Sequence, residues 1–161
     1  MFFLIRFLFI SLILFSIIEN INPISSFLNE FQTNITMYFL SIFIDNDLIE
    51  GTIVNISKTY RVLVSNECNG LLPIVALFSA ILSYTAPIGH KLKYLLITYL
   101  LYTVLNIFRI LIIIFIAFDY GSESFFLSHD ILGNALLILF GLGSFFVFVK
   151  TSKKYSNLSL N

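Results

Sequence analysis

Long apolar runs alternate with short polar segments along this chain, and the alternation predicts most of its elements. Four runs contain almost no charged residue: 2–18, 70–89, 94–118 and 131–149. Roughly 20 consecutive apolar residues are enough for a helix to cross a bilayer. The pattern therefore predicts about four transmembrane helices. We interpret the first as a signal anchor, because no small-residue cleavage site follows it.

The segment between the first two runs, residues 19–69, is more polar and carries two patterns of its own. In residues 24–44 apolar side chains recur at helical spacing and polar ones fill the other side, which predicts an amphipathic helix lying on the membrane or on the other helices. Residues 51–56 and 60–64 are rich in β-branched and aromatic residues around a short polar stretch, which predicts a β-hairpin.

These elements define the expected fold class, an all-α integral membrane protein with a small extracytoplasmic segment. A single membrane domain is expected over residues 1–161, with a basic loop at residues 90–93 and a polar tail at residues 150–161. Polar side chains also follow one face of the third run, because Tyr99, Tyr102, Asn106 and Arg109 are spaced by three or four residues.

The composition agrees with a membrane location and excludes several classes of function. Of the 161 residues 58% are hydrophobic and only 11% are charged, too few to cover the surface of a soluble domain. The net charge is zero and no basic stripe indicates a nucleic-acid partner. One cysteine excludes an internal disulfide, no metal-ligand spacing is present, and nothing suggests a cofactor.

The distribution of basic residues predicts the orientation in the cytoplasmic membrane. The loop at residues 90–93 and the tail after residue 149 are basic, whereas residues 119–130 contain no Lys or Arg. The positive-inside rule therefore places both termini in the cytoplasm and residues 19–68 outside. Cys68 and His129 then lie at the outer ends of two spans, and Arg109 lies roughly 13 Å below the outer end of another.

Three isolated polar groups from three helices thus meet at one side of the membrane, and their chemistry is complementary. Cys68 becomes a nucleophile as the thiolate, which a nearby cation or base favours. His129 could take the thiol proton and return one to a leaving amine. Arg109 offers a permanent charge to a thiolate or an oxyanion, and Asn106, one turn away, could orient it. Glu67 and Asp130 could hold Arg109 or His129.

Each of these residues also has a structural interpretation. The cysteine could be inert packing, and the histidine could be an interfacial residue or a helix cap. An arginine inside a span costs at least a few kcal/mol, so it usually has a partner; here that could be an ion pair with Asp119 or Glu123, or the side chain could snorkel outward. A second hypothesis is a non-enzymatic membrane subunit or assembly partner, in which Arg109 and its polar stripe bind a partner helix and Cys68 has no catalytic role. Such a subunit would tolerate Cys68→Ser, whereas an enzyme would not.

The ordered motifs resemble the exosortase/archaeosortase family. They are Glu67-Cys68-Asn69-Gly70-Leu71, Asn106-Ile107-Phe108-Arg109 and Ser128-His129. The resemblance covers about residues 27–136. The chain departs from the family in having about four spans where many members have more, and in carrying Asn69 where a serine is common.

The resemblance implies a membrane-embedded cysteine transpeptidase or protease with Cys68, Arg109 and His129 as catalytic residues. Asn106, Glu67, Asn69 and Gly70 would support them. Its substrates would be exported proteins with a C-terminal sorting signal, made of a short motif, a transmembrane helix and a basic tail. Cys68 would form a thioester acyl-enzyme at the outer face, and an acceptor amine or water would release it. The partners expected are the substrate's signal helix, the lipid bilayer and an acceptor nucleophile.

Overall fold

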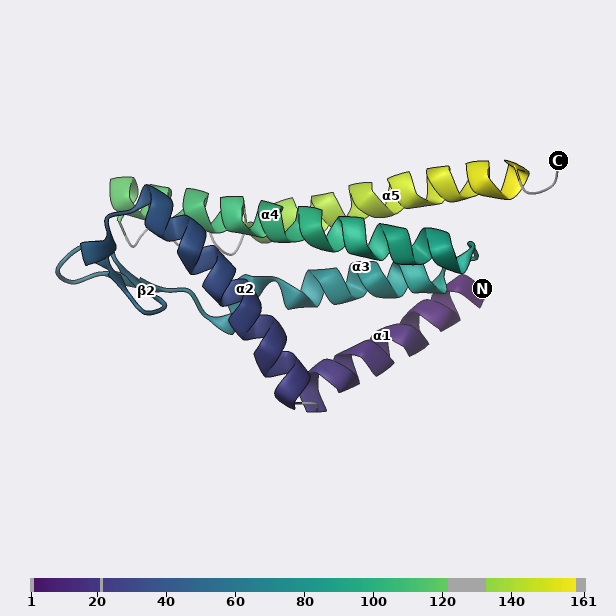
Figure 1. The fold of residues 1–161 in the computed structure, drawn as a ribbon, viewed down its shortest axis with the longest axis horizontal. Helices are drawn as coiled ribbons and strands as arrows, with labels where there is room; N and C mark the ends of the chain where they lie inside the picture. Colours follow the sequence, from purple (N-terminus) through teal and green to yellow (C-terminus); the bar gives the residue numbers. More distant parts are fainter. Residues whose placement is uncertain (1, 21, 122–132, 159–161) are drawn as a thin grey trace. The chain divides into compact units, whose positions relative to one another are not determined.

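The structure, a computed structural model, describes residues 2–20, 22–121 and 133–158, and this part of the chain is mostly helical. Five α-helices and one small sheet follow one another along the chain (Figure 1). Their bounds are α1 Phe2–Asn20, α2 Asn22–Phe43, β1 Ile49–Glu50, β2 Ile53–Asn55, β3 Arg61–Leu63, α3 Leu71–Ser83, α4 Ile88–Tyr120 and α5 Asn134–Leu158. Two short 3-10 helices, η1 (Asn46–Leu48) and η2 (Asn66–Asn69), lie on either side of the sheet in sequence.

The chain packs into two compact units, and α4 contributes to both. The first unit comprises Met1–Asn22, Leu71–Tyr102 and Ile138–Asn161, and the second comprises Pro23–Gly70 and Thr103–Leu137. We name them the basic unit and the site unit, because the former carries six of the nine basic residues and the latter carries Cys68 and Arg109.

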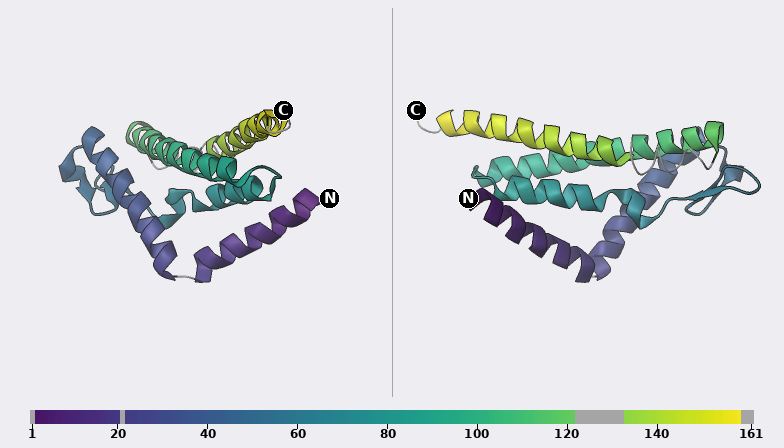
Figure 2. Two further views of the ribbon diagram at one scale, coloured as in Figure 1. Left: turned by 45° about the vertical axis from the view of Figure 1, so that its right-hand side comes forward. Right: turned by 180° about the vertical axis from the view of Figure 1, so that it is seen from behind.

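The basic unit is built from helices that pack along their apolar faces. Helix α1 packs against α3, and α5 from Ile138 onward lies along the first half of α4 (Figure 2). A small core there consists of Leu77, Ile81 and Phe148. The rings of Tyr84 and Tyr94 each pack edge to face against Phe148.

The site unit contains α2, the sheet and the second half of α4. Strands β2 and β3 form the predicted hairpin, with Val54 opposite Val62, and β1 adds an antiparallel strand that was not predicted. Gly51, at φ 63°, provides the tight turn between β1 and β2, a conformation in which glycine carries no Cβ penalty.

One hydrophobic core holds the site unit together. It joins α2, the sheet, Cys68 and α4 through apolar side chains that are at most 8% exposed. Its members are Leu40, Ile44, Val54, Val62, Val64, Cys68, Ile107, Ile110, Leu111, Ile114 and Ala117. Val54 and Val62 of the sheet and Val64, which directly follows β3, are buried in this core. Their packing fixes the position of the chain just before Cys68.

The helices differ in length from the predicted spans. Only α4 and α5, among the described residues, are long and apolar enough to cross a membrane; residues 2–18 and 71–83 form shorter apolar helices. Helix α3 ends at Ser83, six residues before the predicted end of the second span. The prediction of a basic loop at residues 90–93 is wrong, because these residues form part of the first turns of α4, which begins directly after Pro87. The basic residues Lys150 and Lys153 likewise continue α5.

Helix α2 is amphipathic as predicted, but one stripe of its polar residues is buried, whereas the polar Glu30 and Asn34 are exposed. Asn29, Gln32, Thr33 and Thr36, which share one face, are at most 9% exposed. Its exposed side chains are mostly large and apolar: Phe27, Phe31, Tyr38, Phe39, Ile42 and Phe43. A helix of this kind suits a bilayer, because lipid covers the apolar face while protein surrounds the polar one.

Candidate active site

Cys68 lies at a turn that the local sequence specifies. It is in η2, and its backbone N–H donates to the Ser65 carbonyl at 2.9 Å. Gly70 follows in the left-handed conformation, φ 64° and ψ 27°, which most side chains disfavour. Helix α3 begins at the next residue, and Pro73 falls in its first turn, where its missing N–H leaves no bond unmade. Gly70 therefore supports the site through the backbone.

Two polar side chains of α4 point at the main chain of the cysteine. Asn106 Nδ2 donates to the Cys68 carbonyl oxygen at 2.9 Å, and Arg109 Nη1 lies 3.5 Å from the same oxygen. Arg109 Nη1 also donates to Asn106 Oδ1 at 3.0 Å. Asn106 and Arg109 are 2% and 3% exposed, so a permanent positive charge is held in the interior beside the only cysteine.

The thiol itself has both apolar and polar neighbours. Cys68 is 8% exposed within the core that contains Val64 and Ile107, and its Sγ lies 3.8 Å from Ser65 Oγ. An apolar setting opposes thiolate formation, whereas a cation nearby favours it. Arg109 therefore supplies the kind of charge that a buried thiolate requires.

Asn69, the residue after the cysteine, is held by α2. Its Nδ2 lies 3.1 Å from three acceptors, which are the Asn29 carbonyl oxygen, Asn29 Oδ1 and Thr33 Oγ1. Its side chain is fully buried. The cysteine turn is thus held on one side by α4 and on the other by α2.

Sequence reasoning missed the contribution of α2. Asn29, Gln32, Thr33 and Thr36 form a polar stripe on a helix that otherwise carries large apolar side chains, and this spacing was available as a signal. Both polar atoms of the Gln32 amide are buried with no hydrogen-bond partner among the described residues. A buried amide without a partner is costly, most of all inside a membrane protein, so Gln32 is the most unusual side chain of this face.

The structural interpretations of Arg109 fit these contacts less well. The side chain does not snorkel outward, because it is buried and bonds the Cys68 carbonyl. Asp119 is exposed and lies ten residues along α4, about 15 Å away by helical rise, so it is not the partner. Glu123 lies outside the described residues.

The structure brings together Cys68, Asn69, Asn106 and Arg109 from the predicted site. His129 lies outside the described residues, as does the side chain of Glu67, whose backbone belongs to η2. Within the described ranges no three His, Cys, Asp or Glu side chains gather as a metal site.

Taken together, these observations define a helical membrane protein with a buried cysteine and arginine joined through polar contacts. The model of the transmembrane exosortases (Exosortase_EpsH) matches residues 1–149, and the chain belongs to this family, whose members are cysteine transpeptidases. No curated protein and no solved structure matches the chain significantly.

Proposed function

We propose that this chain is a cysteine transpeptidase or protease that cleaves the C-terminal sorting signals of exported proteins through a thioester on Cys68. The contact between Arg109, Asn106 and the Cys68 carbonyl supports the proposal, because a buried permanent cation bonds the main chain of the only cysteine in a chain of this family.

The first half of the reaction forms the acyl-enzyme. His129 takes the Cys68 proton while Sγ attacks the carbonyl carbon of the scissile peptide bond. The C–N bond then breaks, and His129 gives its proton to the departing amine. The positive charge of Arg109 stabilises the thiolate before attack and the oxyanion during it.

The second half releases the exported protein. An acceptor amine, or water, attacks the thioester carbonyl while His129 removes a proton from it. The C–S bond breaks, and the thiolate takes its proton back from His129. Transfer and hydrolysis differ only in the acceptor nucleophile, so the same residues serve both.

Helix α2 has two roles in this proposal. Asn29 and Thr33 position the nucleophile indirectly, because they hold Asn69 next to it. Gln32 contacts the substrate, since its amide can donate to a peptide carbonyl and accept from a peptide N–H, and neither atom has a partner among the described residues. An extended sorting motif presents both kinds of group.

The orientation proposed is the one that the basic residues favour. The basic residues at 90–93 and after residue 149 lie on the cytoplasmic side of the membrane, and Cys68 lies on the extracytoplasmic side. A signal helix in the membrane would then bring its cleavage point to the depth of Cys68.

The test is the processing of a reporter protein that ends in a sorting signal, coexpressed with the full chain in membranes. Wild type should shorten the reporter and form a hydroxylamine-sensitive adduct, and Cys68→Ser should lose both. Because the chain has one cysteine, any adduct reports on this residue. Processing that survives Cys68→Ser would overturn the proposal and favour a non-enzymatic subunit. Ser65→Ala is the matched control, because it removes a hydroxyl next to the thiol but leaves the thiol in place. This variant should still process the reporter.

A membrane-impermeant methanethiosulfonate tests the orientation separately. Intact cells should show labelling of Cys68, with an apparent pKa that rises in Arg109→Ala and in His129→Ala. Labelling that requires permeabilisation would reverse the proposed topology, and a pKa unchanged in both variants would remove the electrostatic role of the two residues.

A further inference from the structure

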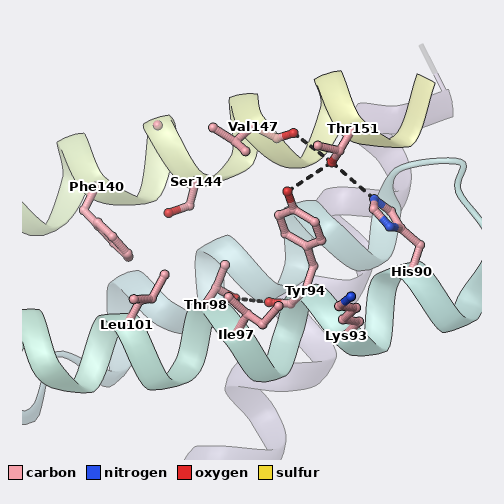
Figure 3. Close-up of a pocket in the computed structure, with 11 residues that line it drawn as sticks. His90, Lys93, Tyr94, Ile97, Thr98, Leu101, Phe140, Ser144, Val147 and Thr151 are labelled. Atoms are coloured by element: carbon pink, nitrogen blue, oxygen red, sulfur yellow. Dashed lines mark hydrogen bonds between the residues drawn. The ribbon is translucent and has the colours of Figure 1, made fainter. Parts of the chain in front are cut away.

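A cavity of about 640 Å³ lies within the basic unit, remote in sequence from the cysteine turn. It is formed between the first half of α4 and the part of α5 after Ile138. Figure 3 shows its two ends: His90, Lys93 and Thr151 at one, and Leu101 and Phe140 at the other. The cavity is therefore polar and basic at one end and apolar at the other.

The polar end is rigid and rich in hydrogen-bonding groups. Thr151 Oγ1 lies 3.3 Å from His90 Nε2 and 3.1 Å from the Tyr94 hydroxyl. His90 is 8% exposed and its ring stacks on Phe148, with centroids 5.4 Å apart. The exposed Lys93, one turn of α4 away from His90, adds an ammonium group to the same cavity.

The two segments that form the cavity carry basic side chains and no acidic ones. Residues 71–102 and 138–161 contain five lysines and no Asp or Glu. Lys91 Nζ donates to the Leu82 carbonyl oxygen at 2.7 Å, and Arg6 of α1 adds another positive charge close to it. An anionic group is therefore the complementary ligand for the polar end.

The length of the cavity indicates which kind of anionic molecule would fit it. From His90 to Leu101 the helical rise is about 16 Å, half of the roughly 30 Å hydrocarbon core, so the cavity reaches one leaflet deep. An acyl chain of that length matches the apolar part of the cavity, which is lined by Ile97, Leu101 and Phe140.

We propose that this cavity binds an anionic phospholipid, with its phosphate at His90, Lys93 and Thr151 and an acyl chain along Ile97, Leu101 and Phe140. The lipid belongs to the cytoplasmic leaflet in the orientation proposed above. The site does not depend on the chemistry of Cys68, and it stands if the proposed enzyme activity fails.

Native mass spectrometry of the full chain in mixed micelles measures this preference. Phosphatidylglycerol should be retained in preference to phosphatidylcholine, and Lys93→Gln should reduce the preference about fivefold, the effect expected of one lysine near an anionic headgroup. Lys58→Gln is the control, because Lys58 is an exposed cation of the site unit. Equal retention of the two lipids by the wild type would overturn the proposal.

The acyl groove has its own pair of variants on one helix. Gly143 lines the cavity and Gly141 does not, and a Cβ added at either position meets no atom within 4 Å. Gly143→Leu should fill the groove and lower the retention of both lipids at least tenfold, whereas Gly141→Leu should not. Equal retention in the two variants, with unchanged helix content by circular dichroism, would place the lipid elsewhere. Displacement of the lipid by a signal-helix peptide, one for one, would make the groove a peptide site and also overturn the proposal.

Discussion

The two units bury polar side chains in different ways. In the basic unit the buried hydroxyls of Ser79, Thr98 and Ser152 donate to carbonyls of their own helix, those of Val75, Tyr94 and Phe148, whereas the buried His90 contacts Thr151 of another helix. In the site unit Asn69, Asn106 and Arg109 bond residues 36 to 41 positions away. Both units are apolar in composition, so their overall polarity does not show which unit contains the candidate active site.

The difference shows how to recognise a site inside a membrane protein. A hydroxyl that bonds the carbonyl four residues before it satisfies itself within one helix and carries no information about tertiary structure. A polar pair that joins two elements fixes their relative position, and it is costly to leave unmade in an apolar interior. By this criterion Asn69, Asn106 and Arg109 mark the candidate active site, and His90 and Thr151 mark the cavity of the basic unit, whereas Ser79 and Thr98 mark neither.

The charges are separated between the units as well. Eight of the nine acidic residues belong to the site unit and six of the nine basic residues to the basic unit. The net charge of zero hides this asymmetry, and the proposed orientation rests on its basic residues alone.

The strongest test of the comparison is the loss of the buried charge. Arg109→Ala should reduce processing by a factor of at least about 100, the usual cost of removing a group that stabilises developing charge. Arg109→Lys should recover only part of it, because an ammonium lacks the planar set of donors. The initial rate of reporter cleavage is the measurement. Arg61→Ala, at an exposed arginine of the same unit, should process normally; an equal loss there would mean that net charge, not the contact with Cys68, matters.

Loss of a long-range bond should also destabilise the fold. Asn69→Ala strands the polar atoms of Asn29 and Thr33, and unsatisfied buried groups cost about 1–3 kcal/mol each. Thermal unfolding in detergent should show the loss, together with slower processing. Asn69→Ser replaces the amide with a hydroxyl on a shorter side chain. Its melting temperature and its processing rate should lie between those of the wild type and those of Asn69→Ala.

A substitution of Gln32 should stabilise the fold, in contrast to Asn69→Ala. Gln32→Met keeps the volume and removes two polar atoms that have no partner among the described residues. The free energy of unfolding should therefore rise by up to about 2 kcal/mol, while the KM for the sorting signal increases because a substrate contact is lost. Destabilisation with an unchanged KM would indicate that Gln32 serves the fold alone.

The smallest effect is expected for a bond within one helix. Thr98→Val removes a hydroxyl that donates to the Tyr94 carbonyl, one turn back, and should change stability by less than about 0.5 kcal/mol without altering processing. A loss comparable with that of Asn69→Ala would remove the distinction between the two units.

Sequence reasoning predicted the helical class, the amphipathic helix and the β2–β3 hairpin, because each has a strong local period. It also grouped Asn106 and Arg109 with Cys68, since isolated polar residues in apolar runs are rare and need partners. It failed where tertiary packing decides. The basic residues at 90–93 are helical because Pro87, not the charges, starts α4. The spacing of the polar stripe on α2 was visible in the sequence, but only the packing shows that this stripe is buried beside the cysteine turn.

The inverted face of α2 has a practical consequence for anyone who isolates the site. Phe27, Phe31, Phe39 and their neighbours would meet water in any excised, soluble version of residues 23–70. The segment would then gain by burying its aromatic side chains and exposing Asn29 and Thr33, the reverse of what Asn69 requires. The lipid therefore covers apolar side chains of α2 that protein does not cover. Thorough delipidation should break the contacts between Asn69 and α2 before the helices themselves unfold.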